Sequence, residues 1–226
     1  MQTLLSAPEL CRVINRNGGA ILDNAPSETV DAYLSIQEKL QNTDVSTDLG
    51  FQTQFLEHHK VRGVRIKNAT LARYFEIMQE EKGSLSMNLR RLSIELFGKN
   101  VAGNVRTNHI SFVSQMMNML NDAYPVFDVN SAYIFGFEGP TQSRMTLNER
   151  IQIYDEFYNY MRSVYQEILE SKMLYDLLKV YEMQLKLKGY KVTIAKRLDL
   201  VVRATGALDK KGLLILPEYR SNYSMA

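Results

Sequence analysis

The sequence predicts an all-α fold, and three observations carry this prediction. Apolar residues recur at helical spacing through most of the 226-residue chain. Residues 146–188 run without a single Gly or Pro, and glycines stand where four of the eight expected helices end. With 45% hydrophobic and 23% charged residues, the composition is that of a globular protein. It excludes a wholly disordered chain, a collagen and a coiled-coil rod.

Helical periodicity divides the first half of the chain into five expected helices. Ser27 is placed to cap the first of them, while Gly83 and Gly98 end the third and the fourth. The fifth is dense in apolar residues and is expected to be buried. Residues 99–107, which precede it, are expected to form a turn around Gly103. The five helices are predicted over residues 27–41, 51–60, 69–82, 85–97 and 110–121.

Capping residues mark the expected helices of the second half. Thr146 and Glu149 have the spacing of a capping box, in which each side chain accepts a hydrogen bond from the other residue's backbone N–H. Thr193 is expected to be an N-cap and Gly206 a helix stop. These signals predict helices over residues 146–170, 172–188 and 193–204.

Two segments stay open between alternatives. Residues 131–137, SAYIFGF, begin a helix or form a short strand, and residues 213–220, LLILPEYR, form a short strand or an extended arm. The chain is expected to divide into an N-terminal helical segment over residues 1–50, a helical core over 51–208 and a C-terminal tail over 209–226.

A cytoplasmic protein with no membrane partner is expected. No run approaches the roughly 20 apolar residues that span a bilayer. The first residues, MQTLLSAPEL, reach an acidic residue before any long apolar core, which argues against a secretory signal. Oligomeric state is not readable from the sequence.

Charge is distributed in alternating blocks, although the whole chain carries only +2. Residues 1–59 and 107–170 each carry −5, whereas residues 60–106 and 171–226 each carry +6. Two basic blocks that fold onto one face would suit a polyanion such as DNA. The alternative is that both blocks are ordinary solvated helix faces.

Several kinds of chemistry are disfavoured by missing motifs. Cys11 is the single cysteine, which excludes a disulfide framework and a multi-cysteine zinc site. His58 and His59 are adjacent, so on a helix they point about 100° apart and are poorly placed to share a metal. The sequence contains no HExxH, EF-hand loop, P-loop or nucleophile elbow. Neither a metal nor an organic cofactor is expected.

The most informative segment is residues 108–137. Pro125 favours an extended backbone before it, so Asp128 follows a short extended piece and stands at the start of SAYIFGF. An aspartate at this place is often only an N-cap. Because Val126, Phe127 and Val129 surround it with apolar groups, Asp128 is alternatively a carboxylate that stabilises a cation formed nearby.

The stretches NHISFVSQMMNMLN and YPVFD resemble the catalytic core of the helix-hairpin-helix DNA glycosylase superfamily. They are most similar to the degenerate bacterial branch with the 8-oxoguanine glycosylase fold. FQTQFLEHHKVRGVRIKNATLARYFEIMQEEKG is similar to an upstream helical region of that branch, and AKRLDLVVRATGAL is similar to its closing helix. The resemblance covers residues 51–208. It implies two helical lobes around a cleft.

The resemblance also implies catalytic roles. Asp128 falls on the catalytic aspartate, which stabilises an oxocarbenium-like sugar and orients the attacking water. Gln115 falls where bifunctional members have a lysine that forms a Schiff base with the sugar. A glutamine has no amine for that step. The chemistry expected is therefore base excision that leaves an abasic site, with no strand cleavage and no cofactor.

The expected DNA contacts come from three places. The hairpin of the family would fall at Asn100–Asn104, where only Gly103 remains, so the docking of this chain on DNA departs from the family pattern. Base-pocket candidates are Tyr124, Phe127, Asn130 and Tyr133, although aromatic residues at this density are more often part of a core. DNA-binding candidates, whose polar members are also suited to helix capping, are Lys60, Arg62, Arg65, Arg106, Asn108, Ser111, Ser114, Lys196 and Arg197.

The function predicted from these observations is monofunctional DNA glycosylase activity, with Asp128 as the essential carboxylate. The expected partner is double-stranded DNA, including modified phage DNA, which would place the protein in DNA repair or anti-phage defence. Two alternatives stay open. Gln115 and the altered hairpin favour a retired glycosylase fold that only binds DNA. The long segment 146–188, rich in Tyr, Met and Leu, would suit a helical protein-interaction module.

Overall fold

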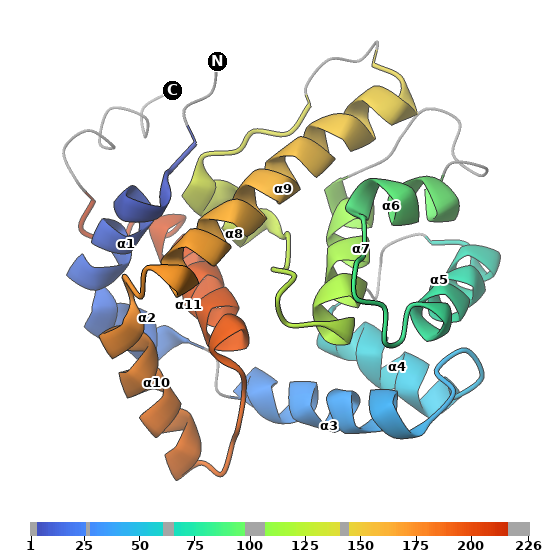
Figure 1. Ribbon diagram of the computed structural model, residues 1–226, viewed down its shortest axis with the longest axis horizontal. Helices are drawn as coiled ribbons and strands as arrows, with labels where there is room; N and C mark the ends of the chain where they lie inside the picture. Colours follow the sequence, from blue (N-terminus) through green and yellow to red (C-terminus); the bar gives the residue numbers. More distant parts are fainter. Residues whose placement is uncertain (1–3, 26–27, 61–65, 98–106, 141–144, 217–226) are drawn as a thin grey trace. The chain divides into compact units, whose positions relative to one another are not determined.

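The computed structural model in Figure 1 is all-α, as the sequence predicts. The structure describes residues 4–25, 28–60, 66–97, 107–140 and 145–216. Within these ranges there are eleven helices and no strand. None of the described helices is both long enough and apolar enough to pass through a bilayer.

The helices vary from about two turns to more than six. The longest, α9, covers Leu147–Glu170 and contains the first part of the Gly- and Pro-free stretch. In chain order the others are α1 (Ala7–Arg16), α2 (Gly18–Asn24), α3 (Glu28–Asn42), α4 (Leu49–His58), α5 (Asn68–Glu80), α6 (Leu89–Phe97), α7 (Thr107–Leu120), α8 (Val129–Phe135), α10 (Tyr175–Leu187) and α11 (Ile194–Asp209).

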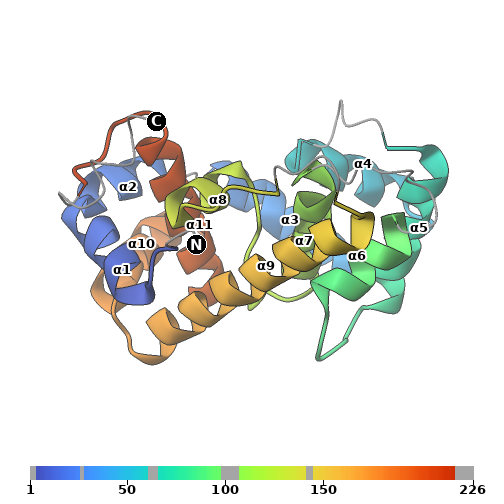
Figure 2. The same ribbon diagram turned by 90° about the horizontal axis from the view of Figure 1, so that it is seen from above.

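The chain forms two compact units, each built from segments that are far apart in sequence. Unit 1 contains Met1–Pro26, Asp128–Glu138 and Tyr160–Ala226, and unit 2 contains Ser27–Phe127 and Gly139–Asn159. This grouping differs from the three consecutive segments that the sequence predicts. The reason is that α2 packs against α11, so the first helices associate with the C-terminal part of the chain. Figures 1 and 2 both show α1 and α2 beside α10 and α11.

Unit 1 is organised around α11, most of whose residues are buried. Its most extensive packing is with the short helix α8. Gly206 was expected to stop this helix, and that expectation is wrong, since α11 continues to Asp209. The physical reason is a close approach of two backbones. A Cβ atom at Gly206 would lie 2.1 Å from the carbonyl oxygen of Asn130, so only glycine lets α8 lie against α11.

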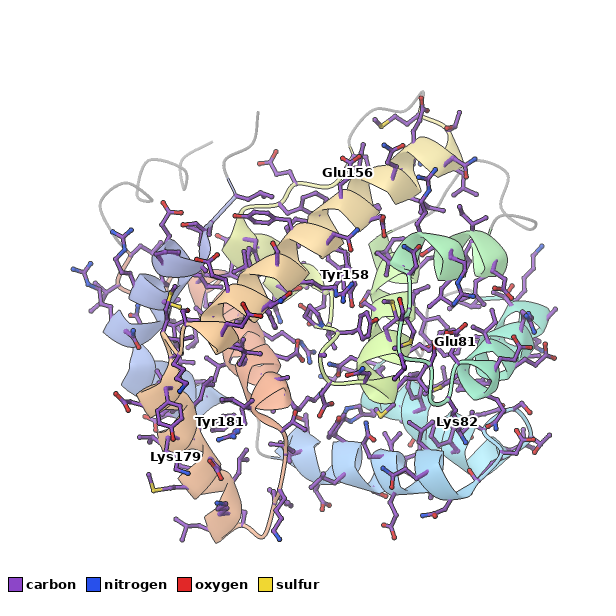
Figure 3. All side chains as sticks on the ribbon, viewed as in Figure 1. Glu81, Lys82, Glu156, Tyr158, Lys179 and Tyr181 are labelled. Carbon is purple, nitrogen blue, oxygen red and sulfur yellow. The ribbon has the colours of Figure 1, made fainter. Side chains whose placement is uncertain are left out.

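Unit 2 has an aromatic core. Tyr74 of α5 and Phe112 of α7 stack with ring centroids 3.6 Å apart, and the Tyr74 hydroxyl donates to the Phe112 carbonyl at 2.9 Å. Phe51, Phe55 and Phe75 complete the cluster, all at 1% exposure or less. Tyr158 of α9, labelled in Figure 3, is also buried. These rings explain why α4, α5 and α7 carry apolar residues at helical spacing.

The predicted helices are confirmed, although several of them begin or end at residues other than those predicted. Capping by Thr146 and Glu149 is present, with the Thr146 N–H donating to Glu149 at 2.7 Å and the Glu149 N–H donating to the Thr146 hydroxyl at 3.3 Å. Thr193 caps α11 by accepting from the Lys196 N–H at 3.0 Å. The helix expected over 85–97 starts only at Leu89, because Asn88 caps it through the Arg91 N–H.

The structure decides between the two alternatives for residues 131–137 and describes the first part of the segment 213–220. Residues 131–137 are helical up to Phe135, and Gly136 ends α8 with a φ of 73°. Residues 213–216 form no strand. They lie along unit 1, where Asn17 accepts from the Ile215 N–H at 2.8 Å and donates to its carbonyl at 3.0 Å. The expected cap Ser27, the stop Gly98, the turn at 99–106 and the rest of the tail lie outside the described residues.

Candidate functional site

Asp128 is the N-cap of α8, which is one of the two interpretations that the sequence left open. Its Oδ1 accepts hydrogen bonds from the backbone N–H groups of Asn130 and Ser131, both at 2.9 Å. Ser131 completes a capping box, because its hydroxyl accepts from the Asp128 N–H at 2.8 Å. The carboxylate is therefore oriented by the helix that it caps.

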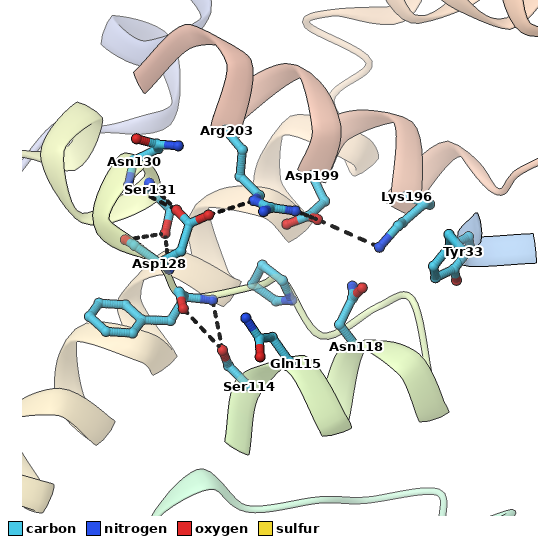
Figure 4. Close-up of polar contacts among 12 residues, drawn as sticks. Tyr33, Ser114, Gln115, Asn118, Asp128, Asn130, Ser131, Lys196, Asp199 and Arg203 are labelled. Carbon is cyan, nitrogen blue, oxygen red and sulfur yellow. Dashed lines mark hydrogen bonds and ion pairs between the residues drawn. The ribbon is translucent and has the colours of Figure 1, made fainter. Parts of the chain in front are cut away.

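The second carboxylate oxygen of Asp128 faces a cation. Oδ2 accepts from Arg203 Nε of α11 at 2.8 Å (Figure 4). The side chain of Asp128 is 16% exposed and that of Arg203 is 33% exposed. Such a pair is partly shielded from water, so its mutual attraction is stronger than that of a surface ion pair.

Two further charges on α11 extend this pair. Arg203 Nη1 lies 3.9 Å from Asp199 Oδ2, and the same oxygen lies 3.9 Å from Lys196 Nζ. Residues 196, 199 and 203 fall on one helix face because they are three and four positions apart. The four side chains alternate in sign, and we call Asp128, Arg203, Asp199 and Lys196 the charge chain.

The charge chain keeps Arg203 cationic. Burial lowers the pKa of the Arg203 guanidinium, but the carboxylates of Asp128 and Asp199 raise it by more, so that it lies above its ordinary value. A carboxylate has about four acceptor positions. Asp128 uses two on Oδ1 and one on Oδ2 for the bonds above. The described residues leave one acceptor position on Oδ2 for a water or a substrate group.

The segment before Asp128 is fixed by polar side chains of unit 2. Ser114 of α7 accepts from the Phe127 N–H at 2.9 Å (Figure 4), and Asn118 donates to the Tyr124 carbonyl at 2.7 Å. The Tyr158 hydroxyl donates to the Pro125 carbonyl at 3.0 Å. These bonds satisfy buried backbone groups of an irregular segment, which would otherwise be costly to bury. They explain why α7 carries polar residues on an otherwise apolar sequence.

Gln115 lies on α7 in unit 2 and is 8% exposed. Its Nε2 is 3.5 Å from the Ser111 hydroxyl, at the limit of a hydrogen bond. Its Oε1 is buried without a hydrogen-bond partner among the described residues. An amide in this position supplies no nucleophilic amine. Asp128 belongs to unit 1 and Gln115 to unit 2.

The aromatic base-pocket candidates divide into buried and exposed residues. Tyr124 and Phe127 are buried in unit 2, where the Tyr124 hydroxyl accepts from the Met87 N–H and Phe127 packs edge-on against Tyr154. They have the core positions that the alternative interpretation predicts. Tyr133 is 44% exposed on α8. Asn130 is half-buried, with its carbonyl against Gly206.

The DNA-binding candidates also differ in how far they are buried. Lys60 is exposed just after α4, and Ser111 is half-buried on α7. Lys196 and Arg197 are only 4% and 9% exposed, so neither is the solvated cation that the charge pattern suggested. Arg62, Arg65 and Arg106 lie outside the described residues, as does the side chain of Asn108.

Sequence reasoning missed the partners of Asp128. Arg203 and Asp199 both stand in α11, and their i, i+4 spacing indicates an ion pair along one helix face. Nothing in the sequence signals that this face meets Asp128, 75 residues away along the chain.

Other chemistry finds little support in the described part of the chain. No group of three or more His, Cys, Asp or Glu side chains is arranged there to hold a metal ion. Burial raises the pKa of the Cys11 thiol to about 12, and Glu167 adds to the shift, so this thiol is protonated and unreactive at neutral pH.

No protein-family model matches the chain, and neither the curated proteins nor the solved structures contain a match to it.

Proposed function

We propose that this protein is a monofunctional DNA glycosylase of the helix-hairpin-helix type, which hydrolyses the N-glycosidic bond of a modified base in double-stranded DNA. The observation that carries the proposal is the state of Asp128. Its carboxylate is oriented by two backbone N–H groups, is paired with Arg203, and among the described residues retains one acceptor position on Oδ2. The resemblance of residues 51–208 to that superfamily supplies the reaction.

The chemistry assigned to Asp128 is electrostatic. As the bond between C1′ and the base nitrogen breaks, positive charge develops on the sugar, and a fixed carboxylate stabilises it. The free position on Oδ2 accepts a hydrogen bond from the attacking water. The water oxygen bonds to C1′, its proton leaves to solvent, and the bonding electrons depart with the base. An abasic site and a free base are the products.

The glutamine at position 115 determines where the reaction stops. A lysine at this place would attack C1′ and carry the reaction on to strand cleavage. The lone pair on the Gln115 amide nitrogen is delocalised into the carbonyl group, so this nitrogen is not a nucleophile. The proposed enzyme therefore leaves the sugar–phosphate backbone intact, and breaks appear only after alkali treatment.

A second candidate function is DNA recognition without base release. The ion pair favours it, because the Arg203 guanidinium lies 2.8 Å from Asp128 and offsets the negative charge that an oxocarbenium-like sugar would experience. Such a protein would bind DNA with strong salt dependence and release no base.

The test is base release from duplexes that carry oxidised, alkylated, deaminated or phage-type modified bases. We expect one class to yield a free base together with abasic sites, and strand breaks to appear only after alkali. Salt-sensitive DNA binding with no base released from any substrate would replace the proposal by the second candidate. Absence of DNA binding at low salt would leave the helical interaction module as the remaining interpretation.

A further inference from the structure

Two small cavities lie where α10 meets the start of α11, within unit 1. The larger has a volume of about 290 Å³ and the smaller about 230 Å³. Both are lined by Glu182 of α10 and Arg197 of α11. Lys186 and Lys191 line the larger cavity, and Lys179, labelled on α10 in Figure 3, lines the smaller one. These charges take no part in the charge chain around Asp128.

Arg197 is held rigidly at the wall of both cavities. Its Nη1 donates to the Leu178 carbonyl at 2.9 Å and to Glu182 Oε2 at 2.8 Å, and its Nε donates to the Thr193 carbonyl at 3.4 Å. A guanidinium has five N–H donors. The two on Nη2 are not used by any of these bonds. Because the side chain is already fixed, little conformational entropy is lost when Nη2 binds a ligand.

The larger cavity carries a surplus of positive charge. Glu182 is the one carboxylate in its lining, against three cations: Lys186, Lys191 and Arg197. Both carboxylate oxygens of Glu182 already have cationic partners, since Lys186 lies 2.6 Å from its Oε1 and Arg197 lies 2.8 Å from its Oε2. Lys191 is exposed and has no ion-pair partner among the described residues. The N-terminus of α11 follows directly, and its backbone N–H groups add partial positive charge.

We propose that the larger cavity binds a phosphate group, carried by a phosphomonoester or a phosphodiester. The planar donors of Arg197 and the ammonium of Lys191 match phosphate oxygens in geometry and charge. A volume of about 290 Å³ is at the lower limit of ligand pockets, which suits one anionic group rather than an extended apolar ligand. The site goes beyond the proposed function and does not depend on base excision.

The test is titration of the full-length protein with inorganic phosphate at constant ionic strength, followed by the backbone amide signals of Val192, Ile194 and Ala195. We expect a saturable shift that chloride does not reproduce. Lys191→Glu should weaken phosphate binding about tenfold, because it replaces a charge-assisted donor by a repelling carboxylate. Lys211→Glu makes the same charge change at an exposed position after α11 and should leave phosphate binding unchanged.

Two further titrations distinguish the sources of the phosphate. A short DNA duplex that shifts the same amides at lower concentration than a nucleoside monophosphate identifies the nucleic-acid backbone as the ligand. A response to the monophosphate alone identifies a small phosphomonoester. A titration with inorganic phosphate that does not saturate, or an equal loss of binding in Lys191→Glu and Lys211→Glu, would overturn the proposal.

Discussion

Two regions of unit 1 use an arginine of α11 in opposite ways. At Asp128, one arginine lies between two carboxylates, because Arg203 contacts both Asp128 and Asp199. At the α10–α11 cavities, one carboxylate lies among cations, because Glu182 contacts Arg197, Lys179 and Lys186. The first arrangement holds a carboxylate in a fixed orientation. The second pairs both oxygens of its carboxylate with cations and leaves donors for an anion.

The net charge of a sequence block therefore does not predict how its charged side chains are used in the fold. Residues 171–226 contain all of these cations and carry +6. Folding commits Lys196 and Arg203 to the charge chain and leaves Lys191 exposed.

The largest effect is expected from Gly206→Ala. The new Cβ would lie 2.1 Å from the Asn130 carbonyl oxygen, so α8 and α11 must separate. We expect the free energy of unfolding to fall by about 3 kcal/mol in urea titrations. Gly19→Ala is the matched control, because nothing lies within 4 Å of a Cβ at this position in α2. It should be neutral or slightly stabilising, and equal losses in both variants would refute the close approach.

Arg203→Met should have the next largest effect. The substitution leaves Asp128 partly buried without its cation, while the methionine retains much of the apolar contact. Because the arginine side chain is 33% exposed, we expect a loss of about 2 kcal/mol, below the value for a fully buried pair. Lys191→Met removes an exposed cation from the other region and should change the free energy of unfolding by less than about 0.5 kcal/mol. A reversed order of the two losses would contradict the comparison.

The smallest effect concerns pH. The hydrogen bonds from Lys186, Lys179 and Arg197 hold the pKa of the Glu182 carboxyl at about 2, below its usual value of 4.5. A carboxyl with a depressed folded pKa stabilises the fold above its unfolded pKa, and this contribution is lost as the pH falls from 4.5 towards 2. NMR titration of the side-chain carbon should give the low pKa in the native protein and a higher one in Lys186→Ala. An unchanged Glu182 pKa in that variant would exclude the proposed ion pairing.

Local features of the fold were predictable from the sequence because they depend on neighbours along the chain. Apolar spacing located α3, α5 and α7, and the capping residues Thr146 and Thr193 have the roles expected of them. The start of α8 at Asp128 follows from the same local logic.

Features that depend on distant segments were not predictable. Gly206 has the appearance of a helix stop, and only the approach of α8 explains why it lies inside α11. Lys196 and Arg197 have the appearance of solvated cations, and only the packing of unit 1 explains their burial. The pairing of Asp128 with Arg203 joins residues 75 positions apart, which periodicity does not reveal.

The most direct test of the central claim is to measure base release and duplex affinity together in Asp128→Asn. Asparagine is also a good N-cap, so α8 should be retained. The matched control is Glu138→Gln, which eliminates an exposed carboxyl group in the same unit. We predict that Asp128→Asn slows base release by about 100-fold or more, while its affinity for duplex DNA stays equal or increases. Equal rates of base release in Asp128→Asn and the native protein would contradict the catalytic role of this carboxylate.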